Sequence, residues 1–293
     1  MRHFILSILI AAWSFSVHGE EMRLVTLGVM PAETVMALDA ADQLIGVDQS
    51  AAGYMAGRNN VHILNYHRTT SSEGVLSINP THVIVTSAAG PPTAIQQIRA
   101  AGVKFLKVAE PLEWQDVVGG IQDLGEFIQR KAEAEVLVAA LQQQKSQADA
   151  QVQEAQQQGT AAPRVLFVMS GSSGSLLCAG AESGADAVIR MAGGVNAATE
   201  FKGYKPISTE ALIQLKPDIV IYPGAGGHAP ASFGQILEEH PGLNQSPAAQ
   251  NNRMHPIDLA ATLGFGPSIG EAILTLVQWF YPETSNAVAL HVN

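Results

Sequence analysis

The chain has 293 residues and a formal net charge of −10, and 14% of its residues are charged and 47% hydrophobic. An acidic chain with scattered Lys and Arg lacks the basic surface that nucleic-acid binding requires, and so high an apolar fraction is typical of a packed globule rather than a disordered chain. Its single cysteine, Cys178, excludes an intramolecular disulfide.

Residues 1–19 have the three-part layout of a secretory signal peptide. A short basic start at Arg2 precedes an apolar run, and small or modest residues lead to a predicted cleavage site between Gly19 and Glu20. The apolar run is shorter than the roughly 20 residues that span a bilayer. Because Cys178 lies far from the new N-terminus, we expect no lipid anchor, and a secreted chain without an anchor points to the periplasm.

Residues 20–112 alternate short β-rich runs with helical patterns. Strands are predicted at 23–28, 44–48, 83–86 and 103–108, and helices at 32–38 and 93–100. Alternation of this kind predicts a parallel sheet with right-handed crossovers, which would form an N-terminal α/β lobe.

Residues 113–160 form a long helical segment. Apolar side chains follow helical spacing from Trp114 to Ile128 and again from Ala134 to Ala155. Glutamine dominates 142–158, and we interpret this tract as the solvated face of a long helix rather than as a partner-binding or aggregation segment, because the apolar series continues beneath it. Residues 159–163 are expected to end the helix.

Residues 161–293 repeat the plan of the first lobe, with strands predicted at 165–169 and 219–222 and a helix at 185–192. Residues 72–85 align without gaps with residues 209–222, an offset of 137 (209 − 72). In both segments a hydroxyl residue, Ser72 or Thr209, is expected to cap a short helix that a proline then ends.

The predicted fold is therefore α/β, with two Rossmann-like lobes joined by a single long α-helix. Open α/β sheets bind ligands at the carboxyl ends of their strands, so we expect a ligand in a cleft between the lobes. Because bending a helix breaks hydrogen bonds, the lobes should move little around it.

Two glycine-rich segments bear on enzymatic function. Residues 171–175 follow a strand but fail the pattern of a nucleophile elbow, because the fifth position is Ser175. Residues 264–270 hold one residue too many for a dinucleotide fingerprint. We therefore expect no enzyme, although spacing along a sequence does not exclude a catalytic site assembled in space.

A metal-ion carrier would need three or four converging ligands. The loop histidines do not show such spacing; they are His62, His67, His82, His228 and His255.

The most informative cluster lies at residues 65–73. In an extended loop the side chains alternate, so Tyr66 and Arg68 should point one way and His67 the other. A ferric ion and a nearby guanidinium both favour the ionised phenol, a hard anionic oxygen ligand, and Arg68 also suits two-point binding of a carboxylate. The same residues would serve equally as a packed ring and a solvated charge.

Residues 66–80 resemble the signature of the periplasmic haem-binding proteins of ABC importers, which runs Gly-Tyr-x-Arg, then Ser-x-Glu-Gly, then Leu-Ser-x-x-Pro. Further matches lie at 165–170, 185–196, 204–208 and 263–266, so the resemblance extends from about Arg23 to Gln278. It implies two lobes joined by a helix, the class III periplasmic binding fold, and haem as the transported ligand.

The resemblance implies that Tyr66 is the axial ligand of the haem iron and that Arg68 assists it. Some members place a second, histidine ligand where this chain has Gly171, which puts a His–Tyr pair at those positions in doubt. His228 is a candidate substitute in the second-lobe loop, and Tyr204 is a candidate lining residue.

Two glutamates complete the implied site set. In the wider superfamily an exposed glutamate on each lobe docks into arginine pockets of the permease subunits, and Glu73 and Glu210 match these by motif and by internal repeat. Each would also favour the dipole of its own helix, which is compatible with docking.

The sequence thus predicts a monomeric, non-enzymatic carrier that binds haem and delivers it to an ABC permease and ATPase complex in the inner membrane. The main alternative is a binding protein for cobalamin or a ferric siderophore with the same fold. An enzyme of the periplasm is the third hypothesis.

Overall fold

The computed structural model describes residues 21–171, 175–224 and 233–283, and the predicted signal peptide lies outside them. The first lobe is a five-stranded sheet in the order β3-β2-β1-β4-β5 in which every pair is parallel. Its strands are β1 (Leu24–Leu27), β2 (Leu44–Asp48), β3 (His62–Leu64), β4 (His82–Thr86) and β5 (Lys104–Val108). This is a Rossmann-like order, as the alternation of strands and helices predicted.

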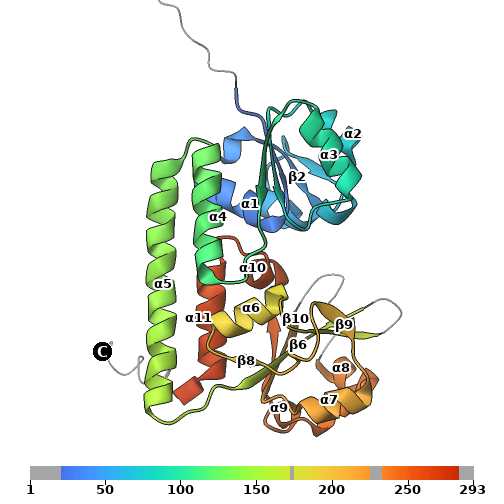
Figure 1. Ribbon diagram of the computed structural model, residues 1–293, viewed down its shortest axis with the longest axis vertical. Coiled ribbons are helices and arrows are strands. Elements are labelled where there is room, and N and C mark those ends of the chain that lie inside the picture. The colour runs from blue at the N-terminus through green and yellow to red at the C-terminus, as the bar shows by residue number, and fades with distance from the viewer. Residues whose placement is uncertain (1–20, 172–174, 225–232, 284–293) are drawn as a thin grey trace, which may run out of the picture.

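Helices cover the first-lobe sheet (Figure 1). They are α1 (Val29–Ala37), α2 (Ser72–Leu76) and α3 (Pro92–Ala100), with short 3₁₀ turns η1 (Ala41–Gln43), η2 (Gln49–Met55) and η3 (His67–Thr69). The chain leaves β1 in one direction towards β2 and β3, and then crosses to β4 on the other side of β1. The switch in strand order therefore falls between β1 and β4, where such sheets bind ligands.

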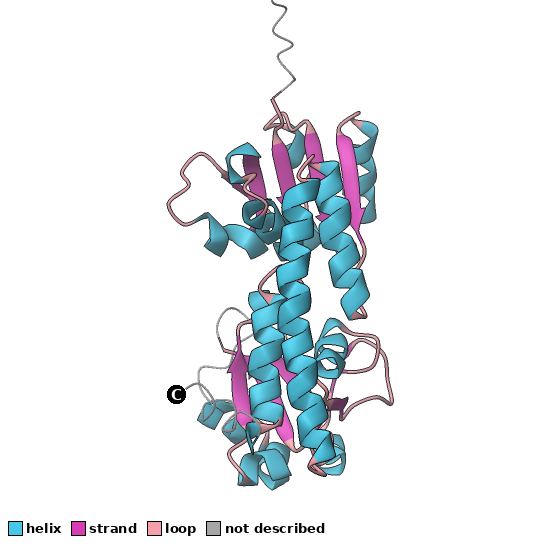
Figure 2. Cartoon of the chain, turned by 90° about the vertical axis from the view of Figure 1, so that its left-hand side faces the viewer, coloured by secondary structure: helices cyan, strands magenta, loops and turns pink. Residues whose placement is uncertain are grey.

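Two antiparallel helices follow the first lobe, α4 (Trp114–Phe127) and α5 (Lys131–Gln157). They match the two predicted apolar series, and α5 is the single long helix that joins the lobes. It runs along both lobes, with α4 beside one half and α11 (Ile269–Phe280) beside the other (Figures 1 and 2). Most of the glutamine side chains lie on its exposed face, as expected, and the helix ends before Gly159, which has a φ of 87°.

The second lobe is built on a six-stranded sheet in the order β11-β10-β6-β7-β9, with β8 paired to β6. Its strands are β6 (Arg164–Ser170), β7 (Leu176–Ala179), β8 (Val195–Asn196), β9 (Tyr204–Pro206), β10 (Ile219–Pro223) and β11 (Met254–Ile257). Its remaining helices are α6 (Gly184–Met191), α7 (Thr209–Leu215), α8 (Phe233–Glu239), η5 (Pro241–Gln245), α9 (Pro247–Gln250) and α10 (Leu259–Leu263).

The expected parallel pairing is confirmed for β6, β8, β10 and β11 of this lobe, but β7 and β9 depart from it. Strand β6 pairs antiparallel with β7, and β7 pairs antiparallel with β9. Only residues 171–175 of the sequence separate β6 from β7. A connection this short joins only antiparallel strands.

The internal repeat holds at the level of the backbone. Adding 137 to the bounds of β4, 82 and 86, gives 219 and 223, the bounds of β10. The residue before each proline, Asn79 and Lys216, has a positive φ of 51° and 44° respectively. The helix caps lie one residue earlier than expected, because Ser71 and Ser208 accept the capping hydrogen bonds.

One continuous apolar core runs through both lobes. It includes Ile84 of the first lobe, Leu141 of α5 and Phe167 of the second lobe, all buried. Hydrogen bonds add direct contacts between the lobes: Ser268 donates to the Glu33 carboxylate, and Arg190 Nη2 donates to the Leu112 carbonyl at 2.9 Å. None of the described helices has the length and apolar character needed to cross a membrane.

Candidate functional site

The chain between β3 and β4 passes over the carboxyl ends of the neighbouring strands, and there it forms the turn at residues 66–70. Thr69 N donates to the Tyr66 carbonyl at 2.8 Å, and residues 67–69 form a 3₁₀ turn. The expectation of an extended loop with alternating side chains is therefore wrong. The hydrogen-bonded turn directs His67 towards the sheet.

The buried carboxylate of Asp48 holds one side of this turn. Asp48 ends β2 and is 0% exposed. It accepts from the backbone N–H of His67 at 3.0 Å and of Gly28 at 2.7 Å. His67 Nδ1 lies 3.0 Å from the same carboxylate, and Ser50 donates from both its backbone and its hydroxyl.

Asp48 is ionised at neutral pH. Burial alone would raise its pKa, but hydrogen bonds from His67, Gly28 and Ser50 outweigh burial and hold the pKa below its usual value. An ionised carboxylate only accepts hydrogen bonds, so the His67 Nδ1 atom must carry the hydrogen that it donates to Asp48.

The loop after β4 holds the other side of the turn. Thr70 N donates to the Gly90 carbonyl and Gly90 N donates to the His67 carbonyl, each at 2.8 Å. The turn is therefore tied to the ends of β2 and β4, on the two sides of β1. This places it over the switch in strand order.

Tyr66 and Arg68 project from this anchored turn. Tyr66 is 38% exposed, and its ring lies 4.3 Å from the His67 imidazole, centroid to centroid. Arg68 is exposed. An exposed phenol beside an exposed guanidinium suits a ligand that carries both a hard cation and an anionic group.

The second lobe contributes Tyr204 of β9. Its ring meets Phe167 of β6 edge-on at 6.1 Å. Although 39% of Tyr204 is exposed, its phenol lies against the start of α6. The pKa of the Tyr204 phenol is raised overall, chiefly by burial and to a smaller extent by the charge of Glu110. A hydrogen bond from the Ala185 backbone and the charge of Arg68 partly offset this increase.

Arg68 and Glu110 belong to the first lobe, so charges of the first lobe act on the phenol of Tyr204 in the second lobe. Glu110 was not among the predicted site residues. It follows β5 in a loop, and no motif in the sequence marks it.

The structure leaves little space for a side chain at position 171, where the chain has glycine. Its backbone N–H donates to the Ser175 carbonyl at 2.7 Å. A Cβ at this position would lie 2.6 Å from Ser175 Oγ and 2.9 Å from Leu177 Cγ, so a larger residue would require Ser175 and Leu177 to move. His228, the proposed substitute, lies outside the described residues.

Glu73 and Glu210 are both exposed, each in the first turn of its helix, α2 and α7. Hydrogen bonds from the Glu210 backbone and from Ser208 lower the pKa of Glu210. Both glutamates are therefore accessible at equivalent positions of the two lobes.

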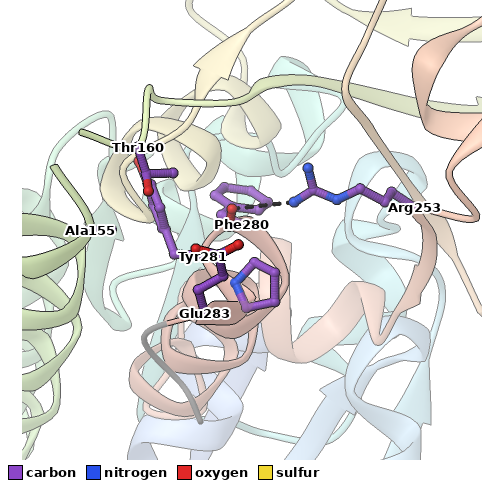
Figure 3. Close-up of a pocket in the computed structure, with 7 residues that line it drawn as sticks. Ala155, Thr160, Arg253, Phe280, Tyr281 and Glu283 are labelled. Atoms are coloured by element: carbon purple, nitrogen blue, oxygen red, sulfur yellow. Dashed lines mark hydrogen bonds between the residues drawn. The ribbon is translucent and has the colours of Figure 1, made fainter. Parts of the chain in front are cut away.

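A separate cavity of about 180 Å³ lies at the base of the second lobe (Figure 3). It is smaller than the roughly 300 Å³ at which ligand pockets begin. Arg253 partly fills its rim, donating to the carbonyls of Trp279 and Phe280 at the end of α11. This cavity is therefore not the candidate site. Across the described ranges, no three His, Cys, Asp or Glu side chains converge as a metal site.

A family model described as periplasmic binding protein matches residues 24–258. The haem-binding protein RhuT of Roseiflexus sp. RS-1 is 31% identical, over 90% of this chain and 100% of its own, with a TM-score of 0.82. A haem-binding protein of Pseudomonas aeruginosa is 31% identical over 89% of this chain and 93% of its own, with a TM-score of 0.79.

A relative from Bacillus subtilis is similar over nearly the whole chain. YvrC, an uncharacterised ABC transporter substrate-binding lipoprotein, is 22% identical over 92% of this chain and 83% of its own. The family model covers most of the chain, and the two solved haem-binding structures align with about nine tenths of it. The chain belongs to the periplasmic binding protein family.

Proposed function

We propose that this protein is the substrate-binding protein of an ABC importer and that its cargo is haem, held between the two lobes. The observation that carries the proposal is the placement of Tyr66 and Arg68, exposed on an anchored turn over the switch in strand order. Relatives that are named as haem-binding proteins and share the whole fold support the same cargo.

Tyr66 is the proposed axial ligand of the ferric iron. A free phenol has a pKa of about 10 and is neutral at physiological pH, but iron bound to its oxygen favours the phenolate. Arg68, two residues further on, adds a positive charge that favours the same anion and can bind a haem propionate.

Tyr204 has a different role in this proposal. Burial raises the pKa of its phenol, which therefore stays protonated. A neutral phenol donates a hydrogen bond and offers a flat face, so Tyr204 is proposed to line the haem-binding side of the second lobe rather than to bind iron. His228 is kept as the candidate second iron ligand.

Glu73 and Glu210 are proposed to dock onto the permease. Both are exposed, and the internal repeat places one on each lobe. Charge reversal at both positions should abolish haem uptake by cells while leaving hemin binding by the purified protein unchanged. Uptake at the normal rate by the double variant would rule out the docking role.

We also propose that the mature protein is monomeric and carries no lipid anchor, unlike its Bacillus relative. The support is that the one cysteine, Cys178, is buried in strand β7. Metabolic labelling with a palmitate analogue, compared with a known lipoprotein from the same cells, tests the anchor. Size-exclusion chromatography with light scattering tests the monomer.

The decisive experiment is a hemin titration of the mature protein beside Tyr66→Phe and a matched control, Tyr281→Phe. Tyr281 lies at the base of the second lobe, where its hydroxyl donates to the Gly193 carbonyl. The wild type and the control should show a Soret band and a ferric-phenolate band, and Tyr66→Phe should lose the latter. A colourless wild type that instead binds cobalamin or a ferric siderophore would overturn the proposal.

A further inference from the structure

We propose that Asp48 is the positioning residue for the iron-binding phenol: through His67 it fixes the turn and the ring on which Tyr66 depends. This inference rests on the proposed function, because it assigns to Asp48 and His67 a role in presenting Tyr66 to the haem iron. Neither residue touches the cargo in this arrangement.

The first step is the central place of Asp48 among the strand ends. Its carboxylate accepts from Gly28, which follows β1, and from His67, which follows β3, while Asp48 itself ends β2. One buried anion therefore ties together the ends of three adjacent strands. Five donor groups point at two oxygen atoms, so removing the charge leaves several donors without an acceptor.

The second step is the connection from His67 to Tyr66. The His67 side chain is only 12% exposed, and its Nδ1 atom lies 3.0 Å from Asp48 Oδ2. The imidazole plane is thereby fixed, and the Tyr66 ring rests against it at 4.3 Å with an interplanar angle of 57°. The same carboxylate accepts from the His67 backbone N–H, so the main chain next to Tyr66 is fixed as well.

The third step is the cost of losing this arrangement. Tyr66 is 38% exposed and would meet the haem iron from a short turn rather than from a regular helix or strand. Binding to iron requires one orientation of the ring, so a ring that samples several orientations must lose that freedom on binding. A positioning residue therefore affects how tightly and in what geometry the phenol binds, without touching the ligand.

The test compares Asp48→Asn with the control Asp42→Asn, which removes an exposed carboxylate of the same lobe. In Asp48→Asn one of the two acceptor oxygens becomes an NH2 group, so the five donors that meet at this carboxylate keep only one acceptor oxygen. We expect a weakened or shifted ferric-phenolate band and hemin transfer to apomyoglobin about tenfold faster, which corresponds to about 1.4 kcal/mol. Asp42→Asn should match the wild type.

A second pair of variants keeps the test decisive if Asp48→Asn fails to fold. His67→Asn retains an N–H donor near the position of Nδ1, whereas His67→Leu does not. We expect His67→Asn to preserve most of the phenolate band and the slow transfer of hemin, and His67→Leu to lose both. Equal behaviour of the two would overturn the role of Asp48.

The outcomes separate this inference from the proposed function. A wild type without a Tyr66-dependent band contradicts haem ligation itself. A wild type with that band, together with an Asp48→Asn protein of identical spectrum and transfer rate, contradicts only the positioning role.

Discussion

Glu33 joins the two lobes through a buried carboxylate, and replacing it gives a prediction with a defined sign. Glu33 lies in α1 of the first lobe and is 8% exposed. It accepts from the backbone N–H of Ser268 at 2.6 Å and from the Ser268 hydroxyl, at the start of α11 in the second lobe. Two hydrogen bonds at about 0.5–1.5 kcal/mol each predict that Glu33→Ala lowers the free energy of unfolding by about 2 kcal/mol.

The pH dependence distinguishes the charge of Glu33 from its hydrogen bonds. Burial raises its pKa above the unfolded value of 4.5, and hydrogen bonds from Ser268 and Tyr54 only partly offset this. Between 4.5 and the raised pKa the folded protein binds more protons than the unfolded chain, so this group's contribution to stability falls as pH rises through that window. In Glu33→Gln an uncharged amide oxygen accepts both hydrogen bonds, and this slope should disappear.

Urea unfolding followed by circular dichroism at a series of pH values between 4.5 and 8 measures both effects. Glu126→Gln, an exposed position on α4, is the matched control and should follow the wild type. We expect Glu33→Gln to be at least as stable as the wild type at pH 8 and Glu33→Ala to be less stable. If Glu33→Gln lost as much stability as Glu33→Ala and kept the wild-type slope, the reasoning would be refuted.

Three further predictions concern other buried groups. Phe167→Ala should lower the free energy of unfolding by about 3–5 kcal/mol, because a fully buried ring leaves a cavity; thermal melting measures this. Asp48 has a lowered pKa, so its stabilisation is present above 3.8 and is lost as pH falls below it; acid titrations of the wild type and Asp48→Asn should converge there. Burial raises the pKa of Cys178 to about 12, so iodoacetamide at pH 8 should alkylate it only after urea is added, as judged by mass spectrometry.

Local patterns in the sequence were sufficient for much of the fold. Strand β2 has the predicted bounds, and the repeat relates β4 to β10 residue by residue, because alternating strands and helices depend on short-range signals. Confirmed elements also include the long joining helix α5, whose apolar side chains recur at helical spacing.

The arrangement around Tyr66 depends on contacts between distant residues. Asp48 and His67 are separated by 19 positions along the chain, and nothing in a lone Asp after a strand indicates which loop it will hold. An extended conformation was predicted for residues 65–73 from residue types alone. Hydrogen bonds to Asp48 and Gly90 instead hold residues 66–70 in a turn. Strands β7 and β9 were missed for the same reason, since their pairing partners are set by tertiary structure.

Because one apolar core runs through both lobes, we expect the spacing between Glu73 and Glu210 to be nearly the same with and without cargo. If these glutamates dock, empty and loaded carriers offer the importer nearly the same pair of contacts. Empty carriers would then compete for the importer, and the loaded fraction of the pool would set the rate of import. The importer would then have to recognise the cargo itself, or the surface around it, before it hydrolyses ATP.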